Sequence, residues 1–520
     1  MSEENNKSNS YRHVLKYTSV FGGAQGLNIL IGLVRNKCVA LILGPSGMGL
    51  MSLLNTAATF LSQATNLGIS FSAIRRTSEI FDSGDRHALL DYISVIRTWS
   101  AVAAALGALA CLVLGPLLDT LSFSWGTHTH HFVLLTPAVV MTALAGGELA
   151  ILKGTRRLKE LVGLQIVSAV LSLLLAVPLF WLFNYKAIVP VISLMALVNF
   201  LPALYVSMLH YPYHVKFTRD SLAKGIPIVK MGVAFTVAAA VASGADMLVR
   251  SLLNLYVDLD AVGLFNAAYM ITITYSGLVF SSMENDYFPR LSAVNSDNRL
   301  VAEVVNRQVE VTLLLMSPLL CLLITTLPIA IPLLFSSEFL PVVPMAQTLS
   351  LALCFKAVTL PMAYVNLAKG KSRAYMILEC GYSVLFMLGS YFSVVWYGLD
   401  GIGWAIVIVH AIEMLAIYIY LRRRFGVALS VQSLSGMAAI MLFAVVTFLS
   451  CRCMEGWMSW AVGLTMSAVS FGLSFRSLRN KRKASTFTCV FTKKSWCYYN
   501  IMCTFASEKK TIKQIMYMKP

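Results

Sequence analysis

Two pairs of charged side chains lie inside apolar segments that are long enough to cross a membrane. Arg35 and Lys37 belong to the first segment, and Asp246 and Arg250 to the seventh. A cation near the middle of a bilayer costs about 2.5–3.5 kcal/mol on the insertion scale, so such residues usually face a cavity or a partner. We interpret all four as candidate substrate-binding residues. Alternatively, Arg35 and Lys37 extend to the headgroups, and Asp246 and Arg250, which share one helix face, form a structural ion pair.

Amide and acidic side chains in the apolar segments form a second set of candidates. Three asparagines are candidate substrate contacts, although they would also suit hydrogen bonds between helices: Asn55, Asn66 and Asn266. Because a carboxyl group inside a membrane can carry a coupling proton, three residues are candidates for ion coupling: Glu148, Asp246 and Glu413. Glu379 is also intramembrane, and His410 precedes Glu413 by about one turn. Ion pairs between helices would explain the same carboxylates, so both interpretations stay open.

The sequence lacks motifs of catalysis and of metal binding. No G-x-x-x-x-G-K-[ST] loop is present, which argues against ATP hydrolysis by this chain. Neither a His-Glu-x-x-His nor a nucleophile-elbow pattern occurs. His128, His130 and His131 lie close together, but no nearby Cys or acidic residue completes a metal site. We therefore expect a carrier and not an enzyme, with no metal and no cofactor.

The composition is that of an all-α polytopic membrane protein. Hydrophobic residues make up 58% of the 520 residues and charged residues 12%, and the mean hydropathy is +0.73. Soluble proteins are about 25% charged. Since a helix needs about 20 apolar residues to cross a bilayer, runs of this length predict about fourteen transmembrane helices. The runs fall near 17–43, 48–72, 91–118, 131–152, 160–183, 187–210, 227–252, 261–283, 311–335, 341–367, 375–397, 401–421, 430–450 and 457–475.

Lysine and arginine are concentrated in every second connection between these runs. The intervening connections contain only Lys186 and Arg452. The basic connections include Arg75, Arg76, Lys153, Arg156, Lys216, Arg290, Lys369, Arg373 and the run 422–424. By the positive-inside rule, these connections and both termini are cytoplasmic. The net charge of +17 is therefore a topology signal, and we expect no nucleic-acid partner.

The chain contains two related halves. Lys16, Phe21, Gly49 and Arg76 each have a counterpart of the same type 214 residues later, at Lys230, Phe235, Gly263 and Arg290. Six helices per half is an even number, so both halves enter the membrane from the same side. The repeats are then parallel, and the substrate site of such transporters lies between the repeats.

Short motifs at matching places resemble the multidrug/oligosaccharidyl-lipid/polysaccharide exporter superfamily, and most closely its Wzx-type flippases of bacterial surface polysaccharides. The resemblance covers about residues 12–425. The motifs are Leu43-Gly44-Pro45-Ser46-Gly47-Met48-Gly49-Leu50, Lys153-Gly154-x-Arg156, Val262-Gly263-Leu264-Phe265 and Phe288-Pro289-Arg290-Leu291-Ser292. Arg35 resembles by position an arginine in the first helix of related peptidoglycan-precursor flippases, although Asn36 stands where an acidic residue follows there.

The resemblance implies a V-shaped pair of six-helix bundles in the bacterial inner membrane that alternates between inward-open and outward-open states. The implied cargo is an undecaprenyl-pyrophosphate-linked oligosaccharide, such as an O-antigen unit or enterobacterial common antigen. Further implied partners are membrane lipids, a polysaccharide polymerase and chain-length proteins. Cations in the cavity would suit a pyrophosphate. The alternatives are a lipid II-type flippase, which the two extra helices favour, and a multidrug cation antiporter, for which an acidic cavity would be expected.

These inferences divide the chain into five parts. The division is a cytoplasmic N-terminal segment at 1–16, a six-helix repeat at 17–215, a second at 216–425, two additional helices at 426–476 and a basic cytoplasmic tail at 477–520.

Overall fold

The computed structural model describes residues 2–123, 128–454 and 456–488, and within these ranges the chain forms helices and no strand. The all-α polytopic class predicted from composition is confirmed. The elements in chain order are α1 (Ser2–Thr65), α2 (Ile69–Ser83), α3 (Arg86–Ser122), α4 (Thr129–Leu134), α5 (Thr136–Gly154), α6 (Leu158–Phe183), η1 (Asn184–Ala187), α7 (Ile188–His210), α8 (Arg219–Tyr256), α9 (Leu259–Tyr269), η2 (Met270–Thr274), α10 (Tyr275–Ala293), α11 (Asn298–Leu334), η3 (Ser337–Val342), α12 (Val343–Ser350), α13 (Ala352–Ala368), α14 (Ser372–Phe425), α15 (Val431–Cys453) and α16 (Trp457–Thr488).

Two of the longest helices each contain a point at which the chain reverses its direction. Helix α1 turns back at Gly44, where φ is 63°, and α14 turns back at Gly398, where φ is 61°. Glycine adopts positive φ without steric cost, so it permits so abrupt a turn. In α14 the two arms lie against each other, because the ring of Tyr382 stacks on that of His410 at 5.2 Å. Each of these helices therefore holds two of the expected spans.

The described part of the chain contains nine helical segments long and apolar enough to cross a membrane, or ten if the bent pair Ser337–Ser350 and Ala352–Ala368 is one span. Three of the nine exceed 39 residues and can supply two crossings each: Gly26–Thr65, Lys159–His210 and Ser372–Phe425. The fourteen expected spans fall on helix, apart from a break at 66–68 between α1 and α2, single non-helical residues at 135 and 351, and the span ends at 335 and 430. The expected tail at 477–520 continues α16 as far as Thr488, and its remainder lies outside the described residues.

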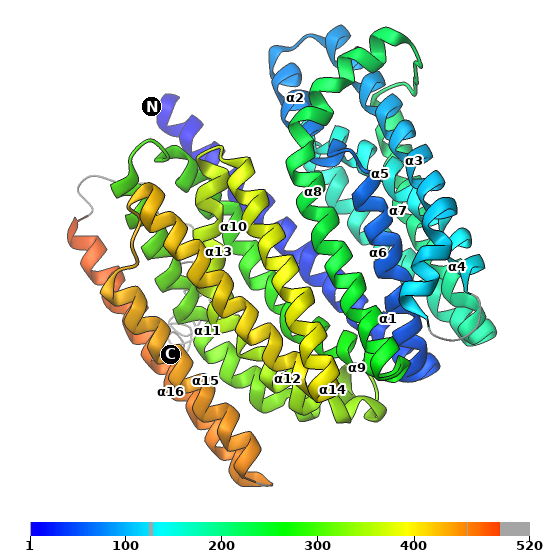
Figure 1. Ribbon diagram of the computed structural model, residues 1–520. Coiled ribbons are helices and arrows are strands. Elements are labelled where there is room, and N and C mark those ends of the chain that lie inside the picture. Colours follow the sequence, from blue (N-terminus) through cyan, green and yellow to red (C-terminus); the bar gives the residue numbers. More distant parts are fainter. Residues whose placement is uncertain (1, 124–127, 455, 489–520) are drawn as a thin grey trace, which may run out of the picture.

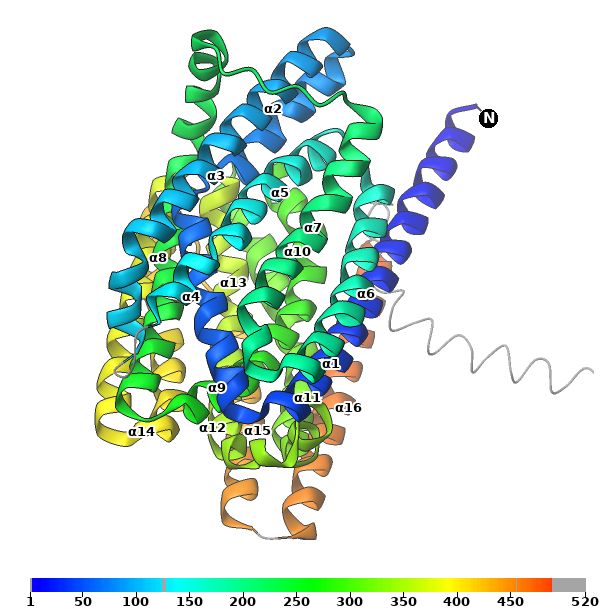
Figure 2. The same ribbon diagram turned by 90° about the vertical axis from the view of Figure 1, so that its right-hand side faces the viewer.

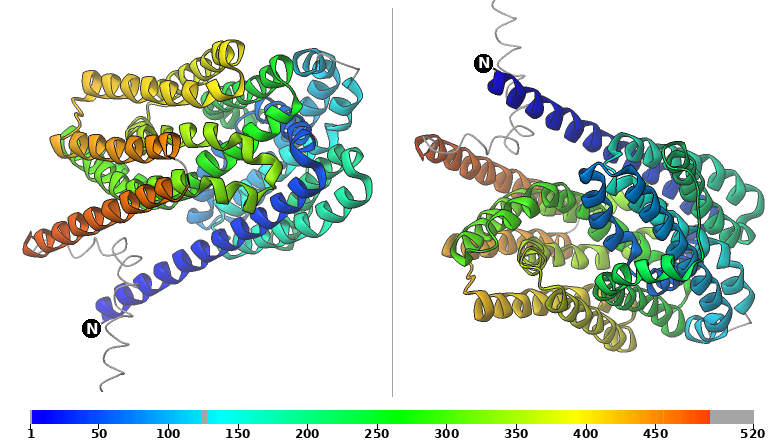
Figure 3. Two further views of the ribbon diagram at one scale, coloured as in Figure 1. Left: turned by 90° about the horizontal axis from the view of Figure 1, so that it is seen from below. Right: turned by 90° about the horizontal axis from the view of Figure 1, so that it is seen from above.

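The helices form two bundles, one containing α2 to α7 and the other α10 to α16 (Figures 1 and 3). The ribbons of the bundles converge near α9 and α12 and diverge toward α2 (Figure 1). Helix α1 descends from the N-terminus to the converging end and then rises again (Figure 2). The basic connections lie at the diverging end, where Arg156 pairs with Asp82 at 2.6 Å. We call this the basic end and the converging end the junction end.

Helix α8 packs on both bundles. In its first half, Lys224 pairs with Asp91 of α3 at 3.0 Å. In its second half, the ring of Tyr256 meets that of Tyr391 of α14 edge to face at 6.0 Å. The boundary at residue 216 follows the order of the chain, whereas in space α8 connects the two bundles.

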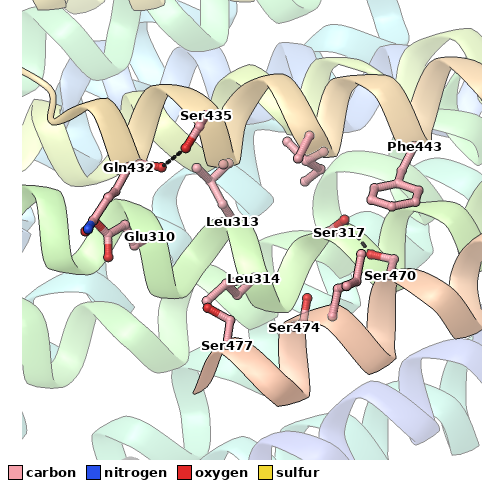
Figure 4. Close-up of a pocket in the computed structure, with 14 residues that line it drawn as sticks. Glu310, Leu313, Leu314, Ser317, Gln432, Ser435, Phe443, Ser470, Ser474 and Ser477 are labelled. Atoms are coloured by element: carbon pink, nitrogen blue, oxygen red, sulfur yellow. Dashed lines mark hydrogen bonds between the residues drawn. The ribbon is translucent and has the colours of Figure 1, made fainter. Parts of the chain in front are cut away.

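The two additional helices α15 and α16 pack against α11 (Figure 4). Ser317 of α11 and Ser470 of α16 share a hydrogen bond of 2.6 Å, and Ser467 donates to the carbonyl oxygen of Pro318 at 3.1 Å. Small and hydroxyl-bearing residues are typical of helix interfaces in membranes, because they permit close approach and hydrogen bonding. A cavity of about 450 Å³ remains between the three helices, with Glu310 and Gln432 among its lining residues.

Candidate substrate and coupling site

At the junction end, residues of the first repeat contact their own counterparts in the second. Ser46 donates a hydrogen bond to Asp260, and Ser52 donates one of 3.1 Å to Asn266. Both pairs are 214 residues apart, which is the offset predicted for the repeat. Contacts between equivalent positions are expected where two parallel repeats meet at a pseudo-two-fold axis.

Two glycines let the backbones of α1 and α9 touch at this junction. Gly49 and Gly263 are also 214 residues apart. A Cβ atom on Gly263 would overlap the carbonyl oxygen of Pro45, and one on Gly49 would overlap that of Leu259. The pair that helped to reveal the repeat in the sequence is therefore a place where the two repeats are in direct contact.

Arg250 joins the junction from α8. Its side chain is buried, with 4% of the residue exposed, and its Nε donates to Ser52 Oγ at 2.8 Å. Its Nη1 pairs with the Asp246 carboxylate and donates to the Asp246 carbonyl oxygen at 3.1 Å. The guanidinium lies over the ring of Phe265 at 5.3 Å. Arg250 and Asp246 thus form an ion pair that is hydrogen-bonded to Ser52 of the first repeat. Ser52 in turn is hydrogen-bonded to Asn266 of the second repeat.

Arg35 and Lys37 are in different surroundings. Lys37 donates to the carbonyl oxygen of Pro332 at 2.8 Å, so it ties α1 to α11 of the second bundle. Arg35 lines a cavity of about 240 Å³ between α1, α6 and η2. The η2 segment is a π-helical turn, a feature found frequently at functional sites. Asn36 contacts Met270 of this turn, with 3.7 Å between Nδ2 and Sδ.

A second polar cluster lies between the two arms of α14. His410 Nδ1 is 2.9 Å from Glu413 Oε2, and both side chains are largely buried. The Tyr382 hydroxyl is 3.4 Å from His410 Nε2. Asp246 lies on α8, which packs against α14. Two of the three ion-coupling candidates, Asp246 and Glu413, are therefore on helices that pack against each other.

The third coupling candidate, Glu148, is elsewhere. It accepts two hydrogen bonds from Arg97 of α3, at 2.8 and 3.1 Å, and 2% and 4% of the two side chains are exposed. Arg97 also donates to Ser207 at 3.1 Å and to the carbonyl oxygen of Pro212 at 2.6 Å. These contacts connect α3, α5, α7 and the loop after α7 within the first bundle. The geometry is that of a structural ion pair.

Of the remaining predicted contacts, Asn266 belongs to the junction, whereas Asn55 and Asn66 do not. The Asn55 side chain is exposed. Asn66 exchanges hydrogen bonds of 3.1 and 3.2 Å with Ser70 at the break between α1 and α2, a local role in the turn. Ser46 and Ser52 were not among the predicted residues. The repeat offset would have found both, because it pairs them with Asp260 and Asn266.

Comparison with known proteins gives the family and the fold of the chain. Residues 14–295 match the family described as polysaccharide biosynthesis protein. No curated protein matches the chain. Among solved structures, the lipid II flippase MurJ in an inward closed conformation is similar, with a TM-score of 0.62 and 14% identity over 88% of this chain and 99% of that chain.

Transporters of the multidrug resistance MATE family, which belong to the MOP superfamily, are similar too. An inward-facing structure has a TM-score of 0.61 and 15% identity over 79% of this chain and 94% of that chain. An outward-facing structure has a TM-score of 0.56 and 14% identity over 79% and 96%. These likenesses concern the fold, and the family match covers more than half of the sequence. The chain thus belongs to the polysaccharide biosynthesis protein family and has the fold of the MOP-superfamily transporters.

Proposed function

We propose that the protein is a flippase that moves an undecaprenyl-pyrophosphate-linked oligosaccharide, such as an O-antigen unit, from the cytoplasmic to the outer leaflet of the bacterial inner membrane. The observation that carries the proposal is the placement of three cations, Arg35, Lys37 and Arg250, where the two bundles of a polysaccharide-family transporter adjoin. A lipid-linked pyrophosphate is anionic, and arginine binds phosphate oxygens through two parallel hydrogen bonds. A cationic drug would be repelled by the same residues.

The junction supports transport by alternating access. Four hydrogen bonds connect the helices at the junction end: Ser46–Asp260, Ser52–Asn266, Arg250–Ser52 and Lys37–Pro332. With the basic end in the cytoplasm, this is the state that faces inward, and the inward-facing MATE structure matches better than the outward-facing one. Export requires these contacts to break. Because Arg250 donates a hydrogen bond to Ser52 of the first repeat, opening the junction also separates Arg250 from that repeat.

The proposal is tested by glycan display in a bacterial strain that lacks its own flippase. Restored display, together with loss of lipid-linked oligosaccharide accumulated inside, would support it. Failure to restore any tested glycan, with export of cationic dyes instead, would favour a multidrug antiporter.

Arg35→Ala is expected to reduce glycan display at least tenfold at equal abundance in the membrane. The loss of a charge-assisted pair of hydrogen bonds to a phosphate is the reason, since each hydrogen bond to a charged group contributes about 1.5–3 kcal/mol. Display and internal lipid-linked oligosaccharide are measured together. Lys186→Ala is the control, because it removes a cation from a loop on the junction side, outside the cavity that Arg35 lines. Unchanged display with Arg35→Ala would exclude the cationic recognition of the cargo.

We infer further that Asp246, Glu413 and their neighbours His410 and Tyr382 couple transport to an ion gradient. A proton is the simplest ion for this cluster, because a His–Glu pair on the second arm of α14, beside Tyr382 of the first arm, can release or take up one. The alternative energy sources for transport are the membrane potential and a Na⁺ gradient. Movement of the α14 arms would then be linked to the junction through Asp246 and Arg250.

Glu413→Gln is expected to leave the folded protein intact and to lower gradient-driven flipping about tenfold or more. Glutamine keeps the hydrogen-bonding shape of the side chain but cannot ionise. Flipping is measured in proteoliposomes with an imposed pH difference, and again with an imposed Na⁺ difference. Glu303→Gln, at an exposed position of α11, is the matched control. Equal stimulation of both proteins by the pH difference would remove Glu413 from the coupling step.

A lipid II-type flippase is the second candidate. The likeness to MurJ extends over 99% of that protein and is thus the observation that favours it. Both candidates share the anionic cargo, so the Arg35 prediction applies to both. Rescue of a strain lacking its lipid II flippase, compared with rescue of glycan display, separates them. A polysaccharide polymerase and chain-length proteins would be further partners only in the first case.

A further inference from the structure

A large groove outside the proposed transport site lies on α14 at the junction end. It has a volume of about 810 Å³ and runs between the two arms of the α14 hairpin toward the end of α15. Its walls are apolar and aromatic, including Phe392, Trp396, Trp404 and Ile408. These side chains are turned outward, with 70% of Trp396 and 47% of Trp404 exposed. Two charged residues, Asp400 and Arg452, line the groove beside them.

Arg452 is held in place at the groove. Its Nη2 donates to the carbonyl oxygen of Pro344 at 3.1 Å and lies 3.4 Å from Thr348 Oγ1. Its guanidinium lies over the ring of Phe448 at 5.4 Å, and that ring meets Trp404 edge to face at 5.8 Å. An arginine that merely extended to the headgroups would need none of these contacts. It is also one of only two basic residues in the connections at this end, so topology does not account for it.

The groove has the length of one lipid chain in one leaflet. Its lining residues on the second arm run from Asp400 at the turn to Ile412, which is about 18 Å along a helix. The hydrocarbon half of a leaflet is about 15 Å thick. The charged residues lie at the outer end of this path, and deeper positions such as Leu385 and Ile412 are aliphatic. A headgroup at the turn and a chain along the arms fit this order.

We propose that the groove binds an ethanolamine phospholipid of the leaflet at the junction end, which is the outer leaflet in the predicted orientation. Arg452 supplies hydrogen-bond donors for the phosphate, and Asp400 accepts from the primary ammonium. The exposed rings of Trp396 and Trp404 add cation–π attraction for the ammonium and an apolar wall for the chain. One cation and one anion lining the same groove match a zwitterionic headgroup, whereas a purely anionic lipid would meet repulsion from Asp400.

Such a lipid would join α12, α14 and α15 at one place. Arg452 belongs to α15 and contacts α12 through Pro344, and the lipid chain would lie on α14. The α14 arms also carry His410 and Glu413, so binding would stabilise the helices that hold this cluster. The inference does not depend on the cargo of the transporter.

The test is native mass spectrometry of the full-length protein in detergent, with dioleoyl-phosphatidylethanolamine, dioleoyl-phosphatidylglycerol or dioleoyl-phosphatidylcholine added. We expect one tightly bound ethanolamine lipid, and a weakening of its binding by about tenfold or more in Arg452→Gln, since one hydrogen bond to a charged group is lost. Asp400→Asn should remove the preference for ethanolamine over glycerol headgroups. Lys186→Gln, the other basic residue at this end, should bind as the unmodified protein does.

Three results would overturn the proposal. Equal binding of the three lipids with no effect of Arg452→Gln would mean that the aromatic residues form only an interfacial belt. Tighter binding of phosphatidylglycerol than of phosphatidylethanolamine, weakened by Arg452→Gln and unaffected by Asp400→Asn, would mean a site for anionic lipids. Binding of cargo-like polyprenyl phosphate in place of ethanolamine lipid would assign the groove to the transport path. If Arg452→Gln does not fold, the headgroup preference of Asp400→Asn decides alone.

Discussion

Gly263→Val is expected to abolish transport while the protein stays folded in the membrane. A side chain at this position would overlap the carbonyl oxygen of Pro45 across the junction. Overpacking of a tight contact costs typically 1–3 kcal/mol. A cost of about 3 kcal/mol to the closed junction alone would shift the equilibrium roughly 100-fold toward the state in which the junction is open. Because the cargo must be loaded while the junction is closed, turnover would stop.

The shift can be measured apart from transport. Cysteines introduced as Ser46→Cys and Asp260→Cys lie on the two sides of the junction, where the native pair is hydrogen-bonded. They should crosslink readily in the otherwise unmodified chain and poorly when Gly263→Val is present. Gly163→Val is the matched control, since a Cβ at that helical glycine has no described atom within 4 Å apart from its chain neighbours and the nearby backbone of its own helix. Normal crosslinking and transport by Gly263→Val would mean that the junction is not a gate.

The repeat shows how much of this site the sequence could predict. Matching residues 214 positions apart indicated two halves, and glycine at both 49 and 263 belonged to that evidence. An internal match carries information about the axis between repeats, because equivalent residues can touch only there. The hydrogen bonds Ser46–Asp260 and Ser52–Asn266 follow from the same offset. The fourteen spans were predictable for a different reason, namely that apolar length alone defines them.

The sequence did not show which residues of different helices contact each other. Glu148 was expected to carry a coupling ion or to form an ion pair between helices, but nothing in the sequence identified its partner Arg97, which is 51 positions earlier in the chain. Apolar periodicity does not specify which of several helices approaches a buried carboxylate. The same holds for α8, whose two halves pack on different bundles. Sequence spacing predicted that Asp246 and Arg250 share a face, but not that Ser52 would complete the contact.

Arg97→Ala is expected to destabilise the first bundle strongly. The substitution leaves the Glu148 carboxylate buried without its bidentate partner and removes donors from Ser207 and from the carbonyl oxygen of Pro212. Breaking a buried ion pair by removing one member costs about 3–5 kcal/mol. We expect a clear fall in the midpoint of thermal unfolding in detergent and a several-fold loss of folded protein in the membrane.

The double variant Arg97→Met with Glu148→Leu tests whether this pair is structural. Replacing a buried ion pair with apolar residues of similar size is often neutral or stabilising, so much of the lost stability should return. A coupling role for Glu148 predicts something else: the double variant would be folded yet insensitive to the ion gradient. Gradient-driven flipping by the double variant at normal abundance would therefore leave ion coupling to Asp246 of α8 and to His410 and Glu413 of α14. A folded but uncoupled double variant would return Glu148 to the coupling path and show that both bundles carry ions.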